Sequence, residues 1–201
     1  IVMALTVVIS LVTGLAFRKK FFGSNLLFYT TVASLIVPSI LVSLGIGLIF
    51  NIMGWEVSWT TSGLGAHLTW TLPFGFLIMI AVFNRFDKSY EEAARDLGAS
   101  NWQTIRHVVL PIIGPSLIGV ALFGFTLSYD EFARTLMTSG VKNTLPLEIF
   151  GMTTNVTTPT LYALGTLTTF FSLLMILTAM GVLFYLRRRQ ESHGSDAGKG
   201  V

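Results

Sequence analysis

Five of the ten acidic side chains of this sequence lie in two short clusters, where charge is available for chemistry. One is EEAARDLGAS, residues 91–100, and the other is the acidic pair in LSYDEF, residues 127–132. Carboxylates attract cations and partner proteins, and an aromatic ring beside them attracts a cation through its face. The three histidines lie far apart and the chain has no cysteine. We therefore expect no metal site and no thiolate chemistry. The remaining role for the acidic clusters is to bind cations or partner proteins by their charge.

Long apolar runs separate these clusters and must position them. Only 11% of residues are charged, whereas a soluble domain carries about a quarter. A membrane-spanning helix needs about 20 mostly apolar residues. Five uncharged runs fit: residues 1–17, 26–50, 64–83, 111–128 and 160–186. Packing all five into a soluble core would leave almost no polar surface. We therefore predict an all-α integral membrane protein, with Pro38 kinking its second span.

The distribution of basic residues predicts the orientation of these spans. All but two of the 13 Lys and Arg residues follow the first, third or fifth span, and the exceptions are Arg134 and Lys142. The basic side is expected to be cytoplasmic, which places the C-terminus inside. The chain starts within an apolar run without Met, so we expect a fragment with a further span upstream. Residues 187–201 are polar and Gly-rich and predict a disordered cytoplasmic tail.

The loop between the third and fourth spans carries its own helix signals. Ser89 and Glu92 have the spacing of a capping box, with acids in the first turn, where the helix dipole favours them. Gly98 is placed to end this helix as its C′ residue. Ser100 with Gln103 predicts a second capping box. From the residues alone, two interpretations stay open: amphipathic helices lying on lipid headgroups, or a docking element for a cytoplasmic partner.

A resemblance favours docking. Glu92-Ala93-Ala94 is followed after three residues by Gly98, and after nine more by VVLP, residues 108–111. This segment resembles the EAA loop of binding-protein-dependent ABC importer permeases, with Val in place of the family's Ile. HLTWTLPFGF, LSYDEF and TLPLEIFGM are similar to segments of the spermidine/putrescine branch. The resemblance covers residues from about 26 to 186.

The resemblance implies a polytopic helical bundle of the type I ABC importer permease kind, with about five spans in residues 1–186 and six in the full-length protein. It implies a non-catalytic subunit of a bacterial inner (plasma) membrane complex. The implied partners are a second permease, two cytoplasmic ATP-binding subunits and an extracytoplasmic solute-binding protein. The partner ATPase uses the ATP, and this subunit binds no cofactor.

The resemblance also assigns residues to the ATPase-coupling loop, residues 84–110, and to the start of the next span. These are Glu91, Glu92, Ala93, Ala94, Asp96, Gly98, Leu110 and Pro111. The segment from Glu91 to Gly98 is expected to be a coupling helix that sits in a groove of the ATPase. Gly98 would set the angle of the corner that follows it.

Polyamines are the cargo that the resemblance favours, because long cations call for carboxylates and aromatic faces. Tyr129, Asp130 and Glu131 follow the fourth span and are the candidate translocation-path residues. Ser39 departs from this pattern, since many relatives carry an acid just after the proline of the second span. His67 is expected to be a hydrogen-bonded packing residue.

Three alternatives to a polyamine importer remain. The first is an ABC importer permease for another solute, such as iron, thiamine, a phosphonate or an opine. The second is an ATP-independent secondary transporter or channel, although the predicted spans lack the ionisable residues that usually carry coupling ions. The third is a purely structural membrane subunit.

Overall fold

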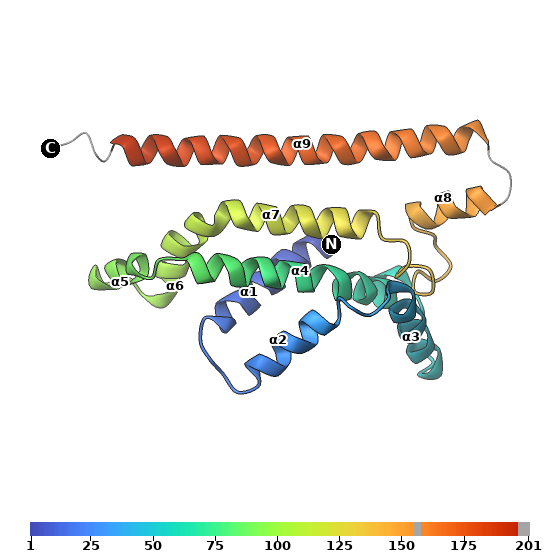
Figure 1. Cartoon of the computed structure of the whole chain (residues 1–201), viewed down its shortest axis with the longest axis horizontal. Helices are drawn as coiled ribbons and strands as arrows, with labels where there is room; N and C mark the ends of the chain where they lie inside the picture. Colours follow the sequence, from blue (N-terminus) through green and yellow to red (C-terminus); the bar gives the residue numbers. More distant parts are fainter. Residues whose placement is uncertain (155–157, 197–201) are drawn as a thin grey trace.

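The computed structural model describes residues 1–154 and 158–196, and within those ranges it contains helices and no β-strand. The helices follow one another along the chain as α1 (Val2–Phe17), α2 (Ser24–Ala33), α3 (Ser39–Ile52), η1 (Trp59–Gly63), α4 (Leu64–Arg85), α5 (Ser89–Asp96), α6 (Asn101–Thr104), η2 (Ile105–Val109), α7 (Leu110–Tyr129), α8 (Leu145–Thr154) and α9 (Pro159–Asp196). Figure 1 labels α1 to α9. The two η segments are π-helices. The predicted all-α class is confirmed.

Helices α1, α4 and α7 pack against one another at the centre of the molecule. Small residues allow the backbones to approach closely, as is usual between membrane helices. A Cβ built on Gly75 of α4 would lie only 2.2 Å from the hydroxyl of Ser10 on α1. One turn away, the buried hydroxyls of Thr6 and Thr71 share a hydrogen bond of 2.7 Å. The buried apolar cluster is separate from this polar contact and consists of Met79, Phe83, Val109, Ile113 and Val120.

The second predicted span is not a single kinked helix, and this prediction was wrong. Residues 26–50 form parts of two helices, α2 and α3, which are separated at residues 34–38. Pro38 has φ −55° and ψ +129°, so its backbone is extended rather than helical. A proline lacks the N–H that would continue the helix and drives the residue before it away from helical geometry. The chain therefore turns where the sequence analysis expected only a bend.

Three helices of the described chain are long and apolar enough to cross a membrane: Trp59–Arg85, Asn101–Tyr129 and Pro159–Tyr185. Five such helices were expected. Helices α1 and α3 are apolar but shorter, because α1 begins at residue 2 and the break before Pro38 shortens the second run. The long Asn101–Tyr129 helix arises because α6, η2 and α7 follow one another without a break.

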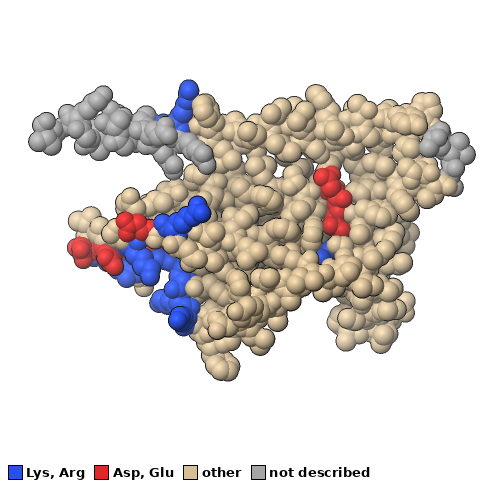
Figure 2. All heavy atoms as spheres, in the orientation of Figure 1, with Lys and Arg blue, Asp and Glu red and all other residues tan. Residues whose placement is uncertain are grey.

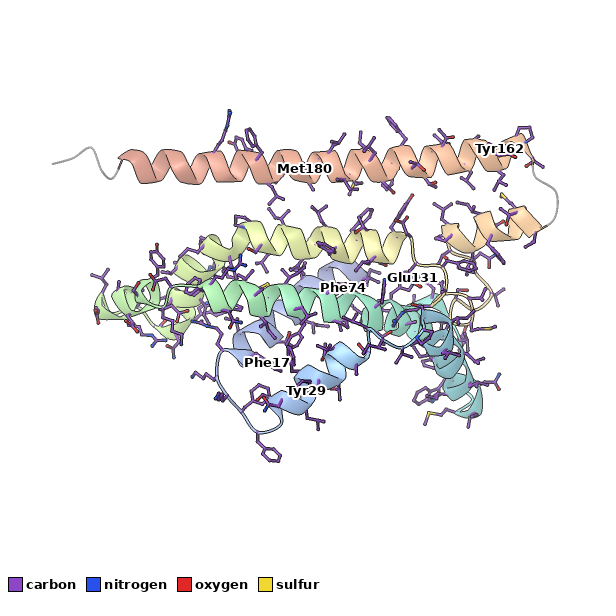
Figure 3. The ribbon with its side chains drawn as sticks, in the orientation of Figure 1. Phe17, Tyr29, Phe74, Glu131, Tyr162 and Met180 are labelled. Atoms are coloured by element: carbon purple, nitrogen blue, oxygen red, sulfur yellow. The ribbon has the colours of Figure 1, made fainter. Side chains whose placement is uncertain are left out.

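Helix α9 lies along one side of the molecule, above α7 and α8 in Figure 1. Phe171 contacts the rings of Phe125 and Tyr129 on α7. Tyr162 and Met180, labelled in Figure 3, are 68% and 58% exposed. The helix continues to Asp196, so the predicted disordered tail is helical at its start, because a formed helix extends readily through good helix-forming residues. Residues 197–201 lie outside the described residues.

Candidate functional site

The charged loop forms helix α5, and Asp87 caps its start. The Asp87 carboxylate accepts the backbone N–H of Ser89 at 3.0 Å, and this bond holds the pKa of Asp87 below its ordinary value. Ser89 is already inside the helix and makes no side-chain cap. The predicted Ser89–Glu92 capping box is therefore wrong. An ionised carboxylate two residues earlier takes its place, and the positive end of the helix dipole favours it there.

The end of α5 and the corner after it follow the sequence prediction. Gly98 has φ +83°, a left-handed conformation that favours glycine. Its N–H donates to Arg95 O at 2.8 Å, and the N–H of Ala99 donates to Ala94 O at 3.0 Å, which together form a Schellman motif. Ser100 and Gln103 then form the predicted capping box, with bonds of 3.3 and 2.8 Å. Both predictions are confirmed.

Glu91 points into the molecule. Its Oε1 accepts from Arg18 Nη1 at 2.6 Å, and Glu91 is only 8% exposed. The Arg18 guanidinium also lies over the rings of Phe83 and Phe86, at 5.2 and 5.5 Å from their centroids. This ion pair fastens α5 to the end of α1. Arg18 was not among the predicted site residues, because no local pattern links two residues so far apart in the chain.

The exposed face of α5 carries the other assigned side chains. Glu92, Ala93 and Asp96 are exposed, and Ala94 is half-buried. Three large side chains that the sequence analysis did not select lie on the same loop, namely Tyr90, Leu97 and Trp102, at 55%, 90% and 65% exposed. Exposed apolar groups beside charges are typical of a protein-binding surface. Leu110 and Pro111 begin α7, after the π-helical η2.

Figure 2 shows Lys and Arg gathered at the end of the molecule that holds α5 and α6. The candidate path residues lie at the opposite end, where Figure 3 labels Glu131 beside the end of α7. The structure does not bring their side chains together. Asp130 is exposed, whereas Glu131 is buried and accepts the backbone N–H of Arg134 at 2.8 Å. Tyr129 is half-buried and stacks on Phe125, with ring centroids 5.4 Å apart.

Arg134 is completely buried, although the sequence analysis counted it among the outer loop charges. Its guanidinium donates to Ser39 Oγ of α3 at 3.2 Å and to Thr69 Oγ1 of α4, and it lies 4.8 Å from the centre of the Trp70 ring. Among the described residues its Nη2 has no hydrogen-bond partner. Burial lowers the pKa of Arg134, and the negative charge of Glu131 opposes that shift. Arg134 thus joins α3, α4 and the segment after α7.

A cavity of about 320 Å³ lies between α4, α7 and the start of α8. Aromatic rings and hydroxyl groups line it, and its lining includes no carboxylate side chain; among the lining residues are Trp59, His67, Phe125, Ser128, Tyr129 and Thr135. His67 is buried and hydrogen-bonded, as predicted. Its Nδ1 lies 2.9 Å from Ser128 Oγ and its Nε2 lies 3.0 Å from Thr135 Oγ1. Of the three candidate path residues, only Tyr129 lines this cavity.

Comparison with known proteins gives a family match along nearly the whole chain. Residues 6–192 match the family described as binding-protein-dependent transport system inner membrane component. The spermidine/putrescine transport system permease protein PotC of Haemophilus influenzae is 32% identical over 178 residues. That alignment covers 88% of this chain and 65% of the relative, so the chain spans just under two thirds of that protein's length.

Two further matches bear on cargo and on fold. The probable sulfate transport system permease protein cysT of Chlorella vulgaris is 38% identical over 116 residues, which is 55% of this chain and 42% of that protein. A solved structure of the MetNI methionine ABC transporter in inward-facing conformations matches with a TM-score of 0.67, covering 92% of this chain and 88% of that one. At 19% identity the structural match shows a shared fold.

Proposed function

Because this chain belongs to the family of binding-protein-dependent transport system inner membrane components, we propose that it is the permease subunit of an ATP-driven ABC importer. The loop geometry supports the proposal most directly. Helix α5 is capped at both ends, fastened to α1 by Arg18–Glu91, and presents Leu97 to solvent. A short rigid helix with an exposed apolar residue is suited to fill a groove on another protein.

The proposed partners are two cytoplasmic ATP-binding subunits, a second permease and an extracytoplasmic solute-binding protein. The ATP-binding subunits hydrolyse ATP, and this subunit supplies no catalytic group. The clustering of basic residues around α5 supports a cytoplasmic location for the loop and for the C-terminus. The membrane is the bacterial inner membrane.

Movement of α5 has two routes into the membrane. The Arg18–Glu91 pair leads to α1, and the continuous helix Asn101–Tyr129 leads to the far end of α7. Both α1 and α7 pack against α4 in the centre of the molecule. A displacement imposed on α5 by the closing ATP-binding subunits would therefore shift α1 and α7 relative to α4. Tyr129, at the end of α7, would carry that shift to the cavity.

A polyamine is the proposed cargo. The similarity to the Haemophilus influenzae protein supports this choice, as do the rings of Trp59, Phe125 and Tyr129 around the cavity, because aromatic faces attract ammonium groups. In this proposal Asp130 lies at the outer mouth and concentrates cations there. Glu131 supports the turn at Arg134.

An anion is the second candidate cargo. The buried guanidinium of Arg134, with its unpartnered Nη2, favours it, and so does the similarity to a protein named for sulfate transport. Iron, thiamine, phosphonates and opines remain alternative cargoes. An ATP-independent transporter or channel is the alternative in a different class.

Uptake in cells that carry the complete complex tests function and cargo together. We expect radiolabelled spermidine to enter, sulfate to be excluded, and uptake to stop when ATP is depleted. Asp130→Asn is expected to lower spermidine uptake severalfold, whereas Glu56→Gln, another exposed acid on the same side, serves as the matched control. Sulfate uptake would replace the polyamine assignment by the anionic one. Uptake that persists without ATP would overturn the importer assignment.

A further inference from the structure

A second cavity, of about 400 Å³, lies where the end of α1 meets the coupling loop. Arg18, Lys19, Lys88 and Arg95 line it together with a single acid, Glu91. Glu91 is already paired with Arg18, and this is the one ion pair found in the described part of the chain. Three cations therefore face the cavity without a carboxylate partner. Like charges held close together repel, so an anion bound between them is stabilised.

The cavity lies at the charged end of α1, which is where a membrane helix would meet lipid headgroups. Helix α1 ends at Phe17 and α4 ends at Arg85, so the cavity opens where the apolar helices give way to charged residues. Leu15 and Ile105 form an apolar part of its wall. A ligand with an anionic group for the cations and an apolar part for this wall would fit the cavity.

An exposed apolar stripe on α1 leads to the cavity. Val8 and Val12 are 57% and 59% exposed, and Leu15 follows at the same helical face. Lys19, two residues beyond the end of α1, lines the basic cavity. A ligand whose apolar part lies along Val8 and Val12 would thus have its charged end beside Lys19.

From this arrangement we infer that the cavity binds the phosphate headgroup of an anionic phospholipid, with an acyl chain along α1. Basic pockets on the cytoplasmic side of membrane helices suit such headgroups. Inorganic phosphate carries a similar negative charge, but it has no apolar part that could contact the apolar wall and stripe. This inference goes beyond the proposed function, because the ligand is bound and not transported. Lys19 follows α1 and Arg95 lies on α5, so an anion bound to both would add a second link between the two helices.

Native mass spectrometry of the complete complex in detergent tests the inference. The probes are phosphatidylglycerol, phosphatidylcholine with the same acyl chains, and inorganic phosphate. The test variant is Lys19→Gln/Lys88→Gln/Arg95→Gln, and the control is Lys20→Gln/Arg85→Gln/Arg106→Gln. The control removes the same charge from exposed cations on the same side that do not line the cavity.

We expect the unmodified complex to bind phosphatidylglycerol more tightly than phosphatidylcholine. The test variant should bind phosphatidylglycerol at least about tenfold more weakly than the control, because each basic residue near an anionic surface contributes about fivefold in affinity. Phosphatidylcholine binding should be the same in both. If the triple variant does not assemble, Lys19→Gln compared with Lys20→Gln gives the same contrast, at about fivefold.

Three results would overturn the inference. An equal loss of phosphatidylglycerol affinity in both triple variants would mean that the lipid is attracted by the basic residues of this end in general and not by the cavity. Inorganic phosphate that binds here and displaces phosphatidylglycerol would identify a soluble ligand. Unchanged lipid affinity, with loss of the ATP-binding subunits from the test variant alone, would mean that a partner protein covers the cavity. These readouts need no transport, so failure of the proposed cargo would leave them unaffected.

Discussion

At the scale of single residues, the structure gives two acids and two bases roles that their position in the sequence does not indicate. Glu91, assigned to the ATPase-coupling loop, is turned inward onto Arg18, and Glu131, assigned to the path, supports a turn at Arg134. Residue type, spacing and the family resemblance selected Glu91 and Glu131 as candidate site residues. They could not predict the partners, because each partner is brought close by packing between helices far apart in the chain.

Loss of the Arg18–Glu91 pair is expected to uncouple the complex. Removing one member of a buried ion pair costs about 3–5 kcal/mol, because the other charge stays unpaired; these two side chains are 17% and 10% exposed. Glu91→Gln and Arg18→Gln should each lower the solute moved per ATP hydrolysed severalfold while the subunits still assemble. The exchange Arg18→Glu/Glu91→Arg should recover part of the loss.

The measurement is transport and ATP hydrolysis by the same reconstituted preparation, with Glu56→Gln as the carboxylate control at an exposed site on the opposite end. An unchanged ratio in both single variants would show that the pair only stabilises the fold.

At the scale of helices, part of the local structure was predictable from near neighbours. Gly98 as the C′ residue of α5 and the capping box at Ser100 follow from residues within one turn, and the sequence predicted both. The Ser89–Glu92 capping box was predicted on the same kind of evidence and did not form. The break before Pro38 and the π-helical η2 were not predicted. A proline disfavours helix equally at a kink and at a break, and the surrounding packing decides which one forms.

Gly98 gives a prediction about the corner after α5. A residue with a Cβ is less stable than glycine in this left-handed conformation by about 1–2 kcal/mol, and asparagine tolerates it best. No atom lies within 4 Å of a Cβ built here, so the effect is backbone strain alone. Gly98→Val should insert normally but retain much less ATPase on purification, whereas Gly98→Asn should retain most of it. Equal retention by the two variants would show that the left-handed corner is not required.

At the scale of the whole molecule, composition predicted the class and the family motif predicted the fold. Three of the five predicted spans contain long apolar helices, and α1 and α3 are shorter apolar helices, since the apolar length of a run does not reveal where its helix breaks. The sequence also did not predict that α2, α3 and α9 lie at the periphery of the helical bundle. Along its most apolar window α9 has no buried residue. In a membrane, lipid and protein surfaces are both apolar, so hydropathy does not distinguish a helix facing one from a helix facing the other.

The predicted orientation is testable because the chain contains no cysteine. Single cysteines replacing Thr60 and Thr153, both exposed, should react with a membrane-impermeant thiol reagent in intact cells. Cysteines replacing Lys20 and Ser100, also exposed, should react only after permeabilisation. Labelling of the Ser100 position from outside would place α5 beyond reach of cytoplasmic ATP-binding subunits.

The unbroken helix from Asn101 to Tyr129 has the length to act as a lever inside this chain. Its 29 residues correspond to a rod about 43 Å long, at about 1.5 Å per residue. The rod begins three residues after Gly98 and ends at the cavity. If the rod pivots at the loop end, a tilt of about 5° sweeps Tyr129 through about 4 Å, by the geometry of a rod of that length. A small tilt that begins at the α5 end would thus move Tyr129 by about the thickness of an aromatic ring.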